Sequence, residues 1–249
     1  GYNSWNNFKE IIKYKNHKII KIEYLKDTYD VGCLTIDAEK KYHDYHTFAL
    51  DCGVFTSNSN TGDIEDVNYL RDKLFTALCV PKAYMGAESD LCLDPETTIP
   101  LLDGTIKSLK DIIATFNNES NYWVYSINTD KKTIEPAKII SAKYTRKNAN
   151  VVKIHLDNEK YLITTPEHLF MMRDGSYKEA QQLKEDDSLM PFYTKISSKK
   201  EKDFANNYEK IYNPYSDIYE YTHRLIDLYT SNGIKLYSNK TVIHHIDFN

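Results

Sequence analysis

The run CLDPETTIPLLDG at residues 92–104 decides how this chain is interpreted, together with TPEH at residues 165–168. The first run begins with a cysteine, and the second has a threonine and a histidine three positions apart at the end of a strand-like stretch. A cysteine supplies a nucleophile, and a histidine exchanges protons near neutral pH. The two runs therefore supply a candidate nucleophile and a candidate proton carrier in a β-rich domain.

The residues between and around these runs alternate as strands do. Period-two alternation predicts one hairpin from residues 152–156 and 161–163, and another from residues 124–127 and 134–140. Residues 109–116 predict a short helix. With 21 tyrosines in the chain, the composition also favours β structure.

Two further segments precede residue 92. Residues 18–58 predict short strands at 18–24, 31–36 and 46–50. Residues 59–91 change to helical spacing, with apolar residues from Ile64 to Leu78, Asp63 as N-cap and Pro81 as the stop.

Composition excludes several classes of protein. The 249 residues carry a net charge of −4, which gives no overall attraction to nucleic acid or membrane. No apolar run reaches membrane-spanning length, and no signal peptide opens the chain. The four cysteines contain no C-x-x-C pair, which argues against a zinc knuckle and favours a reducing, intracellular setting.

Residues 92–104 resemble the first conserved block of inteins, and residues 165–168 resemble their T-x-x-H block. The resemblance implies a mainly β fold, the horseshoe-like Hint fold of hedgehog and intein domains, with residues 92–194 as the N-terminal intein half. It implies that Cys92 attacks the Leu91 carbonyl, that His168 protonates the leaving amide nitrogen, and that Thr165 holds the scissile peptide.

The run HTFALDCGVFTSNS at residues 46–59 resembles the C-terminal intein blocks, so residues 1–58 are expected to form a C-terminal intein half. Asn58 would cyclise and break the chain before Ser59, whose hydroxyl would accept the acyl group. His46 matches the histidine of the penultimate block and would assist both steps. A hedgehog-like domain would lack the Asn58-Ser59 pair.

Two positions depart from the family pattern. Ser57 replaces the usual penultimate histidine, which predicts slower cyclisation of Asn58 or more dependence on His46. Aligning VGCLTI at residues 31–36 with the family places Cys33 where aspartate is common. Cys33 is either an alternative acid or relay, or a small buried residue, and both interpretations stand equally. The other two cysteines, at 52 and 79, are expected to be structural or incidental.

The insert at residues 59–91 resembles a stretch of a tailed-phage portal protein, in TGDIEDV at 61–67 and LFTALCVP at 74–81. Residues 195–249 resemble the start of an α+β HNH homing endonuclease, in YTHRLI at 221–226 and VIHHIDFN at 242–249.

That second resemblance implies a divalent metal such as Mg²⁺ bound by His244, with His245 as general base. The later motif residues would follow Asn249, so we expect a fragment of a longer reading frame without nuclease activity.

The order of the motifs is a C-terminal intein half, an insert and an N-terminal intein half. If the halves associate with each other, this order would release the 33-residue insert as a cyclic peptide, in a single-turnover reaction without a cofactor.

The expected partners are the chain itself and portal exteins, with DNA only for a complete nuclease and no membrane. The expected location is the host cytoplasm during phage infection, with mature portal protein in the virion. A portal structural protein and an HNH nuclease remain the alternative functions.

Overall fold

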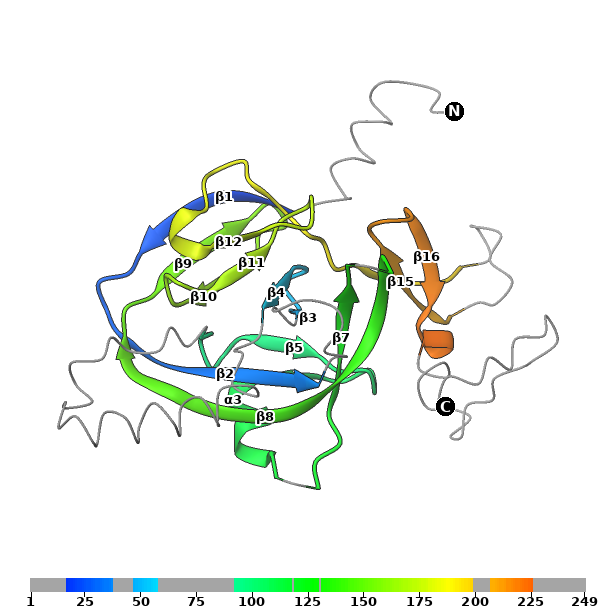
Figure 1. Cartoon of the computed structure of the whole chain (residues 1–249), viewed down its shortest axis with the longest axis horizontal. Helices are drawn as coiled ribbons and strands as arrows, with labels where there is room; N and C mark the ends of the chain where they lie inside the picture. The colour runs from blue at the N-terminus through cyan, green and yellow to red at the C-terminus, as the bar shows by residue number, and fades with distance from the viewer. Residues whose placement is uncertain are drawn as a thin grey trace, which may run out of the picture.

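The computed structural model describes residues 17–37, 47–57, 92–117, 119–129, 131–198 and 207–225. Short antiparallel strands curl into an open, horseshoe-like body (Figure 1). The described elements, in chain order, are β1 His17–Tyr24, β2 Tyr29–Asp37, β3 Thr47–Ala49, β4 Phe55–Ser57, β5 Thr98–Pro100, β6 Ile106–Ser108, α3 Leu109–Thr115, β7 Trp123–Asn128, β8 Thr133–Ala149, β9 Val152–Leu156, β10 Tyr161–Thr164, β11 Leu169–Met171, β12 Tyr177–Glu179, the 3-10 turn Ala180–Gln182, β13 Ser188–Leu189, β14 Thr194–Ile196, β15 Glu209–Asn213 and β16 Ile218–Tyr221. The predicted mainly β, Hint-like fold is confirmed.

Strands from the two ends of the described chain share the same sheets. β1 lies between β9 and β13, β2 pairs with β8, and β4 pairs with both β3 and β11. The largest core cluster likewise combines Ile19, Leu34 and Phe48 with Val152 and Phe170. Neither the strands before residue 58 nor the strands after residue 92 therefore have a complete sheet or core without the other set.

The local sequence signals produce the elements they predict. The two predicted hairpins are β7–β8 and β9–β10, and Glu159 takes a positive φ of 66° in the second turn. Helix α3 begins at a Ser108 cap, whose hydroxyl accepts a hydrogen bond of 3.1 Å from the amide of Asp111. Its buried face consists of Leu109 and Ile112.

The long strand β8 gives the body its curvature. It begins beside β7, then bends and runs along β2 on one side of the molecule (Figure 1). The register between β2 and β8 shifts at three places, after Tyr29, Val31 and Thr35. Such bulges bend a strand and increase its twist, which is how one strand can serve two parts of a curled fold.

The C-terminal described strands pack on this body. β14, β15 and β16 form a three-stranded antiparallel sheet, drawn in yellow and orange in Figure 1. Ile211 and Leu225 share a core cluster with Phe55 and Tyr125. The Asn213 side chain also donates a hydrogen bond of 3.1 Å to the Lys132 carbonyl.

Some predictions fall on residues that the structure does not describe. They are the helix of the 59–91 insert, Cys79, and the histidine pair of the tail. Within the described ranges, no helix is long and apolar enough to span a bilayer.

Gly32 lies at a tight contact between β2 and helix α3. A Cβ at this position would come within 2.8 Å of the Ile113 side chain and 3.1 Å of the Lys143 carbonyl. Gly32 also exchanges backbone hydrogen bonds of 2.8 and 3.0 Å with Leu93. Glycine is therefore needed here for the close approach of helix α3 to β2.

We expect Gly32→Ala to lower the free energy of unfolding by about 1–3 kcal/mol, because the extra methyl group overpacks this contact. Urea denaturation followed by circular dichroism measures the change. An unaltered unfolding midpoint would contradict the assigned packing.

Candidate active site

Cys92 is held through its backbone by two neighbouring threonines. Its amide donates a hydrogen bond of 3.3 Å to Thr165 Oγ1. Its carbonyl accepts hydrogen bonds of 2.8 Å from Thr164 Oγ1 and 3.1 Å from the Thr165 amide. The cysteine is fully buried. The peptide nitrogen that joins residue 91 to Cys92 therefore has a fixed position against the end of β10.

The next residue extends this anchoring. Leu93 forms isolated β-bridges with Gly32 on one side and Thr164 on the other. The amide of Asp94 donates a hydrogen bond of 3.0 Å to the Ile163 carbonyl. Residues 92–94 thus act as a short strand between β2 and β10.

The Cys92 thiol contacts a hydroxyl group from a third strand. Its Sγ lies 2.8 Å from Thr145 Oγ1 on β8, and the surrounding apolar cluster includes Val31 and Ile163. The Thr145 hydroxyl also donates to the Val31 carbonyl over a long 3.4 Å, a bond that it can exchange for one to the sulfur as negative charge develops there. The sequence pattern did not identify Thr145, because its place depends on the bulges between β2 and β8.

His168 closes the turn that begins at Thr165. Its amide donates a hydrogen bond of 3.1 Å to the Thr165 carbonyl, and its ring packs on Phe170 at a centroid distance of 5.3 Å. The side chain is 1% exposed. Its Nε2 atom forms a hydrogen bond with Thr56 Oγ1, on the strand that ends at Ser57.

The structure thus brings together residues next to both predicted junctions. Thr56 lies two positions before Asn58, and it contacts the same turn that holds Cys92. Ser57 is fully buried in β4. The remaining predicted junction residues, His46, Asn58, Ser59 and Leu91, lie outside the described residues, as do His244 and His245.

Cys33 is buried in β2, beside Gly32. Because the side chain at position 32 would face helix α3, strand alternation directs Cys33 to the opposite face. This location is compatible with either role that the sequence left open.

Burial raises the pKa of Cys52 to about 12, so that thiol stays protonated at neutral pH.

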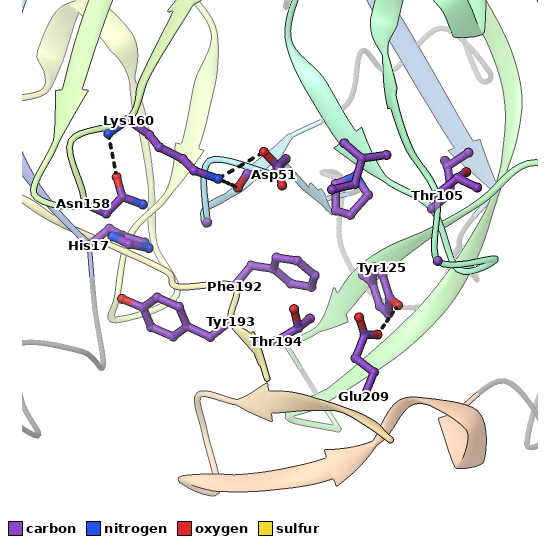
Figure 2. Close-up of a pocket in the computed structure, with 15 residues that line it drawn as sticks. His17, Asp51, Thr105, Tyr125, Asn158, Lys160, Phe192, Tyr193, Thr194 and Glu209 are labelled. Carbon is purple, nitrogen blue, oxygen red and sulfur yellow. Dashed lines mark hydrogen bonds and ion pairs between the residues drawn. The ribbon is translucent and has the colours of Figure 1, made fainter. Parts of the chain in front are cut away.

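A pocket of about 280 Å³ has a lining that does not include Cys92, Thr165 or His168, and Figure 2 shows this lining. Lys160 extends to Asp51, with its Nζ 3.1 Å from Asp51 Oδ2, and Tyr125 donates a hydrogen bond of 3.1 Å to Glu209. His17, on the same wall, lies 2.9 Å from Asp157 through Nδ1. Lys160 and Asp51 form an ion pair, and the Glu209 and Asp157 carboxylates accept hydrogen bonds from Tyr125 and His17, which indicates a structural role for these side chains.

No group of three or more histidine, cysteine or acidic side chains in the described ranges is arranged to hold a metal ion. A curled β body that buries a cysteine against a T-x-x-H turn defines an autoprocessing domain of the Hint class.

The family model described as "Intein splicing domain" matches residues 99–246, and the chain belongs to this family. That match includes most of the tail for which the sequence predicted a nuclease. A second family model, "Bacteriophage T4-like portal protein (Gp20)", matches residues 52–104, which include the whole insert.

Two curated proteins are similar to this chain. One is a DNA gyrase subunit of Synechocystis sp., 39% identical over 166 residues, or 66% of this chain and 15% of the relative. The other is reverse gyrase of Methanocaldococcus jannaschii, 36% identical over 116 residues, or 45% of this chain and 7% of the relative. The chain therefore spans only a small part of either protein.

We expect Thr145→Val to slow thiol-induced cleavage between Leu91 and Cys92 by about tenfold, because the developing thiolate loses a hydrogen-bond donor. Thr145→Ser, which keeps the hydroxyl, serves as the control. The released fragments are quantified by mass spectrometry at several times. Equal rates for the valine and serine variants would show that the hydroxyl is dispensable.

The pocket generates a separate prediction about pH. Burial lowers the pKa of His17, and the opposing effect of Asp157 is smaller. The unfolded chain therefore binds this proton more readily, and stability falls as the pH drops below about 6.5 toward the lowered pKa.

His17→Gln keeps a donor for Asp157 and removes the titration. We expect this variant to lose part of the pH dependence, which for one proton is at most about 1.4 kcal/mol per pH unit. Urea denaturation at pH 7.5 and pH 5.5 provides the comparison. A wild-type and a variant chain with the same pH dependence would exclude His17 as its source.

Proposed function

We propose that this chain excises the segment between its two junctions by protein splicing and releases it as a ring. One observation supports the proposal most strongly: a residue beside each junction hydrogen bonds to the turn formed by residues 165–168. The Cys92 amide donates to Thr165, while Thr56, two residues before Asn58, bonds to His168. Because that turn is closed by a hydrogen bond between its two ends, Cys92 and Thr56 contact the same short segment of chain.

The first step is an acyl shift at Cys92. Sγ bonds to the Leu91 carbonyl carbon, the peptide bond to the Cys92 nitrogen breaks, and the thiol proton passes to that nitrogen. His168 carries the proton. Thr165 and Thr164 hold the two sides of the Cys92 backbone, so that the amide leaves from a fixed position.

The second junction completes the exchange. The Ser59 hydroxyl attacks the thioester, and the Cys92 thiol is released. The Asn58 side-chain nitrogen then attacks its own carbonyl carbon, which forms a succinimide and breaks the bond to Ser59. The freed Ser59 amine finally displaces its own ester, which leaves a peptide bond from Leu91 to Ser59. His46 assists the steps at this junction.

The partner in this reaction is the chain itself. The strands before residue 58 and those after residue 92 share sheets and a core, which supports association of the two halves within one molecule. No cofactor is required, because every bond that breaks is matched by one that forms. The matches to two enzymes over small parts of their length suit an intein carried within different host proteins.

The excised segment and the tail carry the finer proposals. The portal match suggests that the segment derives from a phage portal protein, made in the host cytoplasm and later part of a virion. The nuclease proposal, with Mg²⁺ on His244, His245 as base and DNA as substrate, rests on the sequence alone. Splicing is favoured over it because Cys92, Thr165 and His168 form a described site.

Mass spectrometry of the purified chain tests the splicing proposal. We expect a 33-residue product from residues 59–91 whose mass is lower than that of the linear peptide by one water. Cys92→Ala should abolish it and also abolish cleavage by added thiol. Asn58→Ala should keep thiol cleavage but release no ring. An intact wild-type chain, or only linear peptide, would refute cyclisation, and thiol cleavage of the Cys92→Ala chain would refute the role of Cys92.

A further inference from the structure

The hydrogen bond between Thr56 and His168 has an assignable donor and acceptor. Thr56 is fully buried, and its Oγ1 lies 3.0 Å from the Leu169 carbonyl oxygen. The same Oγ1 forms the hydrogen bond with His168 Nε2. A carbonyl oxygen can only accept, so the single hydroxyl proton is used toward Leu169.

The tautomer of His168 follows from this count. Since the Thr56 proton is committed, Oγ1 offers a lone pair to Nε2, and Nε2 must carry a proton. Nδ1 is then the nitrogen at which the ring gains and loses its catalytic proton. A histidine in this state first takes a proton and then gives it back, as the acyl shift at Cys92 requires.

We propose that Thr56 is a positioning residue for the reaction at Cys92, although it belongs to the strand of the other junction. It fixes the ring orientation and tautomer of His168, and it stabilises the imidazolium by accepting from Nε2–H. This inference rests on the proposed splicing function. It adds that activation of Cys92 depends on docking of β4, the strand that ends next to Asn58.

The pairing of strands supports this dependence. Thr56 is the β4 residue that pairs with Phe170 on β11, two residues after His168. The strand β4 also pairs with β3, and its Phe55 amide donates a hydrogen bond of 3.2 Å to the Met190 carbonyl. If β4 were undocked, His168 would lose its acceptor. The link would prevent Cys92 from forming a thioester before β4, the strand next to the Asn58-Ser59 junction, is in place.

The proton and electron balance of the step is complete within the chain. The Cys92 thiol gives its proton to Nδ1, and Sγ bonds to the Leu91 carbonyl carbon. The carbon–nitrogen bond to Cys92 breaks, and Nδ1–H returns the proton to the departing nitrogen. Thr56 accepts from Nε2–H throughout, so it lowers the energy of the charged intermediate state of the ring.

Three single variants separate this role from general packing. Thr56→Val removes the hydroxyl at nearly constant volume, and Thr56→Ser keeps it. Thr222→Val is the matched control, because Thr222 is another buried threonine whose hydroxyl donates a hydrogen bond of 2.8 Å, to Glu209. Thiol-induced cleavage after Leu91 is followed for each full-length chain across pH 5 to 9, and thermal unfolding reports folding.

We expect Thr56→Val to slow cleavage by roughly 10- to 100-fold, as loss of part of a general acid–base contribution. Its rate profile should also shift to lower pH, because the imidazolium loses its acceptor. The serine variant and Thr222→Val should stay within about threefold of the wild type. A folded Thr56→Val chain with wild-type rate and pH profile would overturn the proposal.

A second measurement does not depend on splicing. In the full chain with Cys92→Ala and Asn58→Ala, which cannot react, the nitrogen chemical shifts of His168 report its tautomer and its titration. We expect a proton on Nε2 in the neutral ring, and a lower titration midpoint when Thr56→Val is added. A neutral ring protonated at Nδ1 would overturn the inference. Failure of the wild-type chain to cleave or splice would refute only the proposed function.

Discussion

The fold and the site both depend on the insertion of residues 92–94 between β2 and β10. Leu93 bridges Gly32 and Thr164, and Cys92 is fixed by the end of β10. This short strand connects a strand from before the insert to strands from after it. Cys92 is therefore placed by the same hydrogen bonds that join the two halves of the body. A change that weakened the contact between the halves would also weaken the positioning of Cys92.

Sequence patterns predicted the parts of the structure that local chemistry controls. Alternation identified the hairpins β7–β8 and β9–β10, and the short helix predicted at residues 109–116 is helix α3. The motif around Thr165 and His168 also gave the turn that holds Cys92. These features succeed because each is decided within about twenty residues, by periodicity, caps and turns.

The missed residues are those whose place is decided by register between distant strands. Thr145 reaches the Cys92 thiol only because bulges shift β8 against β2. Thr56 reaches His168 only because β4 pairs with β11, more than a hundred residues away. Thr164 carried a weak signal, since it is the polar end of an apolar, buried run. A threonine in a strand is ordinarily explained by β propensity alone, so nothing in the sequence distinguished the other two.

The composition of the site follows from its burial. Four threonines, at positions 56, 145, 164 and 165, hydrogen bond to Cys92 or His168, and His168 is the side chain for which we propose proton transfer. A permanent charge buried at this place would carry a large desolvation cost unless it were paired. A hydroxyl group avoids that cost, because it can donate to one neighbour and accept from another as charge appears and disappears. The Thr56 hydroxyl against the His168 ring and the three threonine hydroxyls around Cys92 are all uncharged, so these side chains add no permanent charge to the buried site. That neutrality is what allows the centre to be assembled between two strands of a hydrophobic core.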